Sequence, residues 1–391
     1  MSDTGQEHTA PADAGQNAFA ALHAQLDQIV EDNIRIPGVP AWILLCGYNI
    51  GETAEVLGLA EAFVEHHGHG IILVVTQKHA PLARMYSHRF LKIVVMTDDM
   101  MRAFLRSDYI PQERFELNMP ISACWIDRGF RAGDGIKYLT QYAGRGGISE
   151  TDMARFIMRL PWNARWEAPR ISPEMEERAW QLSRECGVRL GRTVLLCPIN
   201  NSASKFPYEF WAALAARLNE LGYTVLTNVG GLNPFNGLHT MPIEGTTPVD
   251  LPMELVIPFI HLCGRVVTGT NGMSFFMMLG GLKTFKMTQL IPQSKDIQVG
   301  HSSLGYRAPY QQKGSPIIGS YLYMSPELAL DSPLNEFIIP YDESVEELQR
   351  LARVVAEQDT SDPASVSRLG AGGRLPYLVE HADWLRPIAP R

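Results

Sequence analysis

The sequence predicts an α/β protein built from two doubly wound domains, each a parallel sheet covered by helices, that face one another across a cleft. With 391 residues the chain is too long for one ordinary core. In both halves, short apolar runs alternate with helical patterns, which is typical of parallel sheets. Between the halves, residues 161–173 hold three prolines and two tryptophans without periodicity, which indicates a passage between domains.

The first half is expected to form a domain over residues 41–165, preceded by a partly disordered extension over residues 1–40. Residues 1–18 are rich in Ala, Gly, Asp and Gln, a composition that favours disorder, and a helix is expected over residues 19–30. Within the domain, apolar runs predict strands at 41–48, 71–76, 91–97 and 121–126. A helix is expected at 53–67, because apolar residues recur there with helical spacing.

The second half repeats this alternation over residues 174–342. Helices are expected at 174–186, 208–221, 252–262 and 273–280, and strands at 193–197, 223–227 and 266–268. An amphipathic helix over residues 343–358 is expected to close the fold by crossing back to the first domain, and residues 359–391 form a tail. Ligands of such sheets bind beyond the carboxyl ends of the strands.

Composition excludes several classes of function. The net charge of −8 and the pI near 5.8 disfavour a nucleic-acid binder that relies on a basic surface. Five widely spaced cysteines without a C-x-x-C pair suggest neither a zinc site nor a disulfide framework, which fits a reducing cytoplasm. The most apolar later stretch, residues 261–282, contains Arg265 and Asn271 and is too polar to span a bilayer. We therefore expect a soluble, cytoplasmic protein.

Charge is distributed unevenly along the chain. Residues 84–170 hold 14 Lys/Arg against 10 Asp/Glu, although the whole chain is negative. Two interpretations of this basic excess remain open. The arginines are either solvated individually, or they form a face that binds an anionic acceptor or the inner surface of a membrane.

The most informative loop lies between the strand at 193–197 and the helix at 208–221. It carries Ser202, Ser204 and Lys205, and Pro207 is expected at the first helical position. A helix N-terminus offers free N–H groups and a positive dipole end, which suit a phosphate group, and Lys205 adds a full charge. The loop therefore favours a diphosphate site, although capping alone would also explain its Ser and Asn residues.

A second loop of this kind follows the strand at 266–268. It contains Thr270, Asn271, Gly272, Met273 and Ser274, and its glycine lets a backbone approach a ligand closely. An ordinary turn would explain the loop taken alone. Two such loops on what we expect to be neighbouring strands favour one shared phosphate site.

The first domain contributes the loop from Gly47 to Thr53, which places Glu52 near a helix N-terminus. Glu52 either complements the helix dipole or serves as a general base that faces the other domain. Glu55 and Asp127 are alternative bases. No metal is expected: His66, His67 and His69 end a helix beside Gly68 and Gly70, where capping explains them, and no Asp-x-Asp occurs.

With these loops assembled, the chain resembles the heptosyltransferase-like glycosyltransferases of family 9, which have the GT-B fold. That family opens its second domain with a Pro-Gly-Ala-Ser-like loop, a lysine and Trp-Pro before a helix. Here the counterpart is Pro198-Ile-Asn-Asn-Ser-Ala-Ser204, Lys205 and Phe206-Pro207. The family's Gly-Asp pair, whose carboxylate is its base, has its counterpart in Gly51-Glu52.

The chain also departs from the family pattern. The family's Asp-Thr-Gly-Leu-x-His becomes Thr270-Asn-Gly-Met-Ser-Phe275, which keeps the glycine but lacks the Asp and the His. Leu232 and Asn233 follow Gly230-Gly231, where an acidic residue would hold a ribose. The resemblance thus implies a divergent transferase of polysaccharide or glycolipid synthesis rather than a true heptosyltransferase.

The resemblance implies that a nucleotide-diphosphate sugar binds the second domain as donor substrate, with a saccharide or glycolipid acceptor on the first. Attack by one base-activated hydroxyl would invert the anomeric centre, and positive charge at the diphosphate would stabilise the leaving group without a metal. Two alternatives remain open: a nucleotide-sugar epimerase and a non-catalytic sugar-nucleotide-binding or scaffold protein of a glycan biosynthesis complex.

Overall fold

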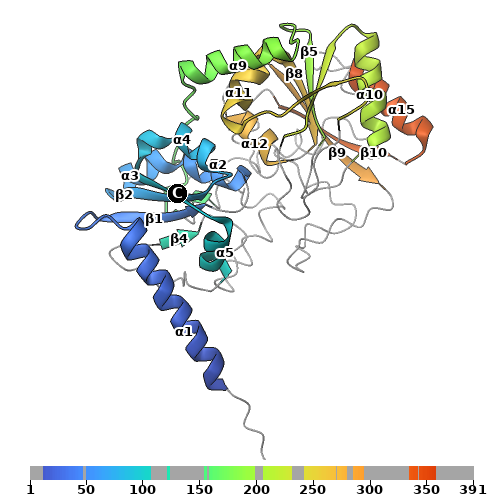
Figure 1. Ribbon diagram of the computed structural model, residues 1–391. Coiled ribbons are helices and arrows are strands. Elements are labelled where there is room, and N and C mark those ends of the chain that lie inside the picture. The colour runs from blue at the N-terminus through green and yellow to red at the C-terminus, as the bar shows by residue number, and fades with distance from the viewer. Residues whose placement is uncertain are drawn as a thin grey trace, which may run out of the picture.

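The structure is a computed structural model that describes residues 12–46, 50–106, 121–123, 154–155, 158–198, 206–230, 242–269, 271–279, 285–294, 334–341 and 343–357. Within them the chain forms two parallel sheets with helices packed against them (Figure 1). This arrangement confirms the predicted α/β class with two doubly wound domains.

The first sheet has the strand order β3-β2-β1-β4, and all its strands run parallel. Strands β1 and β2 are apolar and buried on both faces, as expected for central strands of a covered parallel sheet. Trp42 and Leu44 face one apolar cluster while Ile43 and Leu45 face another. The elements of this domain are β1 (Ala41–Cys46), α2 (Ile50–Gly58), α3 (Ala60–His67), β2 (Gly70–Thr76), α4 (Ala80–Met85), η2 (Ser87–Arg89), β3 (Phe90–Met96), α5 (Asp98–Arg106) and β4 (Ile121–Ala123).

An N-terminal helix, α1 (Ala12–Ile29), and a π-helical turn, η1 (Val30–Ile34), precede this sheet. Only the C-terminal part of the helix packs on the domain, through Leu26 and residues around it, and the rest projects outward (Figure 1). The helix begins earlier than the expected residue 19. The alanines between residues 12 and 21 explain the extra turns, because alanine has the highest helix propensity.

The second sheet has the order β10-β9-β8-β5-β6-β7, again with parallel strands throughout. Strands β7, β9 and β10 were not expected from the sequence. The described elements are α9 (Pro173–Glu185), β5 (Thr193–Cys197), α10 (Tyr208–Glu220), β6 (Thr224–Asn228), β7 (Thr247–Val249), η4 (Met253–Leu255), α11 (Val256–Cys263), β8 (Gly264–Gly269), α12 (Gly272–Leu279), β9 (Lys286–Ser294), β10 (Leu334–Tyr341) and α15 (Val345–Glu357).

The strand order identifies the point where ligands bind in folds of this kind. Counted along the chain, the order reads third, second, first, fourth, fifth, sixth, with β5 as the first strand and β8 as the fourth. This is the order of dinucleotide-binding sheets, in which the ligand crosses the carboxyl edge where the order reverses. In this chain the reversal lies between β5 and β8. The first sheet shows the same pattern over four strands, with its reversal between β1 and β4.

The passage between the domains is attached to the first domain. Glu167 donates its N–H to Gly58 O at 2.8 Å, and Arg170 donates to Met85 O at 3.1 Å. The guanidinium of Arg89 binds both carboxylate oxygens of Glu167, at 2.7 and 2.9 Å. Helix α9 begins directly afterwards and packs on α11 and η4 of the second domain.

The helix expected to cross back to the first domain packs elsewhere. Helix α15 lies on α10 of the second domain, with Leu348, Leu351 and Val355 in one apolar cluster with α10 and β5. Arg265, at the start of β8, donates to Val355 O at 2.6 Å and Ala356 O at 3.1 Å, which caps the end of α15. The apolar stripe of α15 is thus used within the second domain.

Candidate functional site

The two candidate phosphate loops leave neighbouring strands at the reversal of the second sheet. Strands β5 and β8 pair directly, with Cys197 opposite Thr268. The hydroxyl of Thr268 lies 2.7 Å from Gly269 O and accepts a hydrogen bond from Asn271 Nδ2 at 3.2 Å. This pairing agrees with the expectation that the two loops follow neighbouring strands. Ser202, Ser204, Lys205 and Thr270 lie outside the described residues.

The start of α12 is closed by a reciprocal cap. Ser274 N donates to Asn271 Oδ1 at 2.8 Å, and Asn271 N donates to Ser274 Oγ at 3.1 Å. The buried Ser274 hydroxyl also donates to Asn271 O at 2.7 Å. These two residues therefore cap the helix, and the N–H groups of Gly272 and Met273 are those of the first turn that the cap does not use.

Helix α12 meets helix α2 of the first domain at two glycines, as the neighbouring positions of these helices in Figure 1 indicate. A Cβ atom on Gly272 would lie 3.0 Å from Gly51 N and 3.2 Å from Ile50 Cβ. The absence of a side chain thus allows the two helix starts to touch. The structure brings together the loops that contain Gly51 and Gly272, and with them the position of Glu52, the next residue of α2.

Of the three carboxylates considered as a base, only the side chain of Glu55 is described. It is 1% exposed, one turn into α2, beside the fully buried Thr53. A buried carboxylate is costly unless the protein compensates it, and its burial separates it from a solvent-borne acceptor. The side chain of Glu52 and the whole of Asp127 lie outside the described residues.

Sequence reasoning missed Asn228, a buried residue at the carboxyl end of β6. Its Oδ1 accepts hydrogen bonds from Gly230 N at 3.1 Å and Leu251 N at 3.4 Å. Its Nδ2 lies 3.1 Å from Met273 Sδ. Asn228 thus joins the ends of β6 and β7 to the start of α12. The signal in the sequence is a polar residue that ends an apolar strand directly before Val229 and Gly230.

The structure describes the histidines at the end of α3, where helix capping was expected, and the buried Cys197. Gly68 ends α3 with a left-handed φ of 67° and donates to Val64 O at 2.9 Å, which confirms the glycine cap expected at this helix end. No group of three or more His, Cys, Asp or Glu side chains suited to a metal ion occurs among the described residues. Burial raises the pKa of the Cys197 thiol to about 12, so this thiol is protonated at neutral pH.

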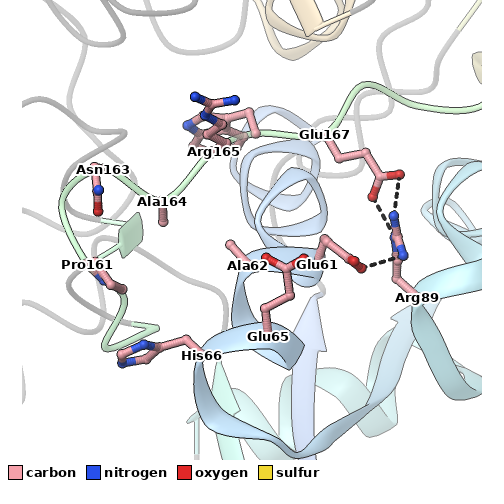
Figure 2. A pocket seen from close by; sticks show the side chains of 11 residues that line it. Glu61, Ala62, Glu65, His66, Arg89, Pro161, Asn163, Ala164, Arg165 and Glu167 are labelled. Carbon is pink, nitrogen blue, oxygen red and sulfur yellow. Dashed lines mark hydrogen bonds and ion pairs between the residues drawn. The ribbon is translucent and has the colours of Figure 1, made fainter.

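An open pocket of about 560 Å³ lies on the first domain, away from these loops. Figure 2 shows α3 on one side of it and the passage between the domains on the other. Arg89 holds Glu61 and Glu167 together at one end. None of the residues predicted for the site lines this pocket; its residues are Glu61, Ala62, Glu65, His66, Arg89, Pro161, Asn163, Ala164, Arg165, Trp166 and Glu167.

Among the described residues, no helix combines the length and the apolar character that a membrane crossing requires.

Comparison with known proteins gives matches among solved structures only. No family model and no curated protein matches the chain. A glycosyl transferase family 9 structure from Veillonella parvula is 13% identical, with a TM-score of 0.46, and the match covers 90% of this chain and 99% of that one. The chain resembles it in shape.

Two further structures are similar at the same level. The ADP-heptose lps heptosyltransferase II of E. coli is 12% identical with a TM-score of 0.46, over 76% of this chain and 90% of that one. Arabidopsis thaliana UGT89C1, complexed with UDP, is 13% identical with a TM-score of 0.41, over 89% of this chain and 100% of that one. The two-domain architecture itself rests on the strand orders described above.

Proposed function

We propose that the protein is a glycosyltransferase that moves a sugar from a nucleotide-diphosphate sugar to a saccharide or glycolipid acceptor. The observation that supports this most is the pairing of β5 with β8 at the reversal of the second sheet, where both candidate phosphate loops emerge. The contact between Gly51 and Gly272 adds that the first domain meets the second at this edge. A donor site on the second domain and an acceptor site on the first would then lie next to each other at this contact.

The donor diphosphate is proposed to bind between the two loops. Lys205 would supply a full positive charge, Ser202 and Ser204 hydroxyl donors, and the start of α12 the N–H groups of Gly272 and Met273. Helix starts favour anions through these N–H groups and the helix dipole. Charge placed there stabilises the diphosphate as it leaves the sugar, which is where negative charge develops in this reaction.

Glu52 is proposed as the general base. As the residue after Gly51, it occupies the first turn of α2 at the boundary with the second domain. It would take the proton of the acceptor hydroxyl while the hydroxyl oxygen attacks the anomeric carbon and the bond to the diphosphate breaks. A single in-line displacement of this kind inverts the anomeric centre.

Exchange of carboxylates for amides tests this assignment. Glu52→Gln should lower turnover by about 10²–10⁴-fold, the usual contribution of a general base, with little change in nucleotide affinity. The matched control is Glu65→Gln, an exposed carboxylate on α3 of the same domain. Full turnover in Glu52→Gln would exclude Glu52 as the base and move the role to Asp127.

The resemblance to family 9 supports a place in bacterial surface polysaccharide or lipopolysaccharide synthesis, with a hexosyl or heptosyl donor. A glycolipid acceptor would bring the protein to the inner face of the membrane. The excess of basic residues between 84 and 170 is consistent with such a contact. Retention on anionic vesicles at low but not at high salt would test it.

A second candidate is a non-catalytic protein that binds a sugar nucleotide within a glycan biosynthesis complex. The internal cap between Asn271 and Ser274 favours it, because the cap engages groups that a catalytic loop would offer to the donor. This candidate predicts nucleotide binding without release of nucleoside diphosphate from any donor and acceptor mixture.

A further inference from the structure

The two domains share one apolar cluster instead of having wholly separate cores. Buried side chains of both sheets belong to it, among them Leu44 and Leu73 in the first domain and Leu195 and Val266 in the second. All four are at most 1% exposed. Apolar packing is therefore continuous from β1 and β2 of the first sheet to β5 and β8 of the second.

Two pairs of elements form the contact between the domains. Helix α4 of the first domain lies on η4 of the second, and α2 lies on α12 (Figure 1). In the first pair, Leu82 and Met85 of α4 and Leu255 of η4 are buried members of the shared cluster. In the second pair, Gly51 and Gly272 let the two backbones approach closely. The domains thus meet through packed apolar surface at two separate places.

The chain that crosses between the domains leaves little freedom for a hinge. Arg170 N donates to Met85 O at 3.1 Å, which ties the passage to the first domain. Ser172 is the N-cap of α9, and its side chain accepts a hydrogen bond from Met175 N at 3.2 Å. Only Ile171 lies between these two anchored residues, and it packs against the shared cluster. A hinge needs residues whose backbone angles can change, and here they are held on both sides.

Two domains of one chain are expected to move relative to each other unless the interface between them is large and hydrophobic. The shared cluster, the two packed contacts and the short crossing place this chain under that exception. We propose that the two domains move as one rigid unit, so that the donor nucleotide binds at a preformed boundary without domain closure. Where it concerns the donor, this inference rests on the proposed function. A preformed boundary makes every molecule competent to bind, so no affinity is lost to an open state.

Native-state hydrogen exchange of the full chain without ligand tests the rigid unit. Strands β1 and β5 are interior strands of the two sheets, so their slowest amides report on the opening of each domain. If the domains open only together, both strands should show the same free energy of opening and the same dependence on denaturant. A lower value in one strand would show that its domain opens alone, and would overturn the inference.

Leu255→Ala should weaken the coupling, because it removes apolar packing where η4 meets α4. The protection factors of the slowest amides in β1 and β5 should then differ by about 10-fold or more. The matched control is Leu214→Ala, a buried leucine in a cluster that belongs to the second domain alone. It should lower the protection of both strands equally, by at least about 30-fold. Separation of the two strands in Leu214→Ala as well would contradict the rigid unit.

Small-angle scattering of the wild type with and without saturating ADP, GDP, UDP or CDP tests the preformed boundary. The radius of gyration should stay unchanged when a nucleotide binds. A decrease on binding would show domain closure, which would overturn the inference and leave the proposed function standing. Binding of none of the four would contradict the proposed function, and hydrogen exchange of the free protein would still decide whether the domains move together.

Discussion

The carboxyl edges of the two sheets use their polar residues differently. In the second domain Asn228, Thr268 and Asn271 form hydrogen bonds with the backbone and with one another, next to the candidate loops. In the first domain Thr53, Glu55 and His79 are at most 1% exposed. Polar groups of both edges are buried, since Asn228 and Thr268 are at most 3% exposed. Those of the second edge are prearranged by hydrogen bonds, whereas Thr53 Oγ1 and His79 Nε2 at the first edge have no hydrogen-bond partner in the described part of the chain.

The largest effect expected from this difference concerns Lys205. If the second edge holds the donor diphosphate, Lys205→Ala should reduce turnover by about 10²–10³-fold, as the loss of a preorganised electrostatic donor often does. Release of nucleoside diphosphate in the presence of acceptor would measure it.

Lys286→Ala is the matched control, since Lys286 is an exposed lysine at the amino end of β9, on the opposite edge of the same sheet. Near-normal turnover in Lys205→Ala would remove the phosphate role of the loop after β5. Equal losses in both variants would indicate a general effect of charge.

The buried His79 at the first edge should make the stability of the protein depend on pH. Burial, with a smaller contribution from Lys78, lowers the pKa of His79 from 6.5 to about 4. Between pH 6.5 and pH 4 the imidazole is therefore protonated in the unfolded chain but neutral in the folded protein. The free energy of unfolding must fall as the pH drops from 6.5 to 4. His79→Gln should remove on the order of 2 kcal/mol of this loss.

Denaturant unfolding at several pH values would measure the slope. His69→Gln, at an exposed position of the same domain, should keep the wild-type slope. An unchanged slope in His79→Gln would show that the imidazole is not held neutral by the fold.

At the contact between α2 and α12, an added side chain should be tolerated at one glycine but not at the other. A Cβ on Gly272 would lie 3.0 Å from Gly51 N, whereas a Cβ on Gly51 would meet its nearest neighbours at 3.7 Å. Gly272→Ala should therefore lower the free energy of unfolding by about 1 kcal/mol, the low end of overpacking costs. Gly51→Ala serves as the matched control and should be nearly neutral. Equal stability of the two variants would contradict the close contact of α2 with α12.

The smallest effect is expected where the passage is attached to the first domain. Hydrogen bonding from Arg89 lowers the pKa of the Glu167 carboxyl. A lowered carboxyl pKa adds stability above the unfolded value near 4.3, and this stability disappears as the pH falls through the folded value.

Glu167→Gln should therefore cost on the order of 0.5 kcal/mol at pH 7, since the pair is partly exposed, and less below about pH 4. Unfolding curves at both pH values would measure this difference, with Glu65→Gln as an exposed control on α3. A cost that is as large at pH 3 as at pH 7 would exclude the ion pair as its source.

The strands with continuous apolar sequences could be predicted from the sequence, and those with polar residues could not. Strands β1 and β5 are apolar runs buried on both faces and were expected nearly at their observed bounds. Strand β7 has three residues with a central proline, and β9 and β10 contain Gln, Asn, Glu and Pro. These strands form because neighbouring strands pair with them, which local sequence does not reveal.

The positions of the site residues were likewise only partly predictable from the local sequence. Helical periodicity placed a helix near residue 208, but Pro207 has a ψ of 165° and is the cap residue rather than the first helical one. The loops after β5 and β8 were identified by their residue types. Asn228 was not, because Leu251, which donates to its side chain, lies 23 positions further along the chain and becomes a neighbour only through the pairing of β6 with β7.

The central claim is that the second domain binds a nucleoside diphosphate at the reversal between β5 and β8. A thermal-shift screen of the wild type and Lys205→Ala against ADP, GDP, UDP, CDP and dTDP tests it most directly. We predict stabilisation of the wild type by one of them, about 2.7 kcal/mol at 100 times its Kd, and loss of this effect in Lys205→Ala. Equal stabilisation of both proteins, or of neither, would contradict the claim.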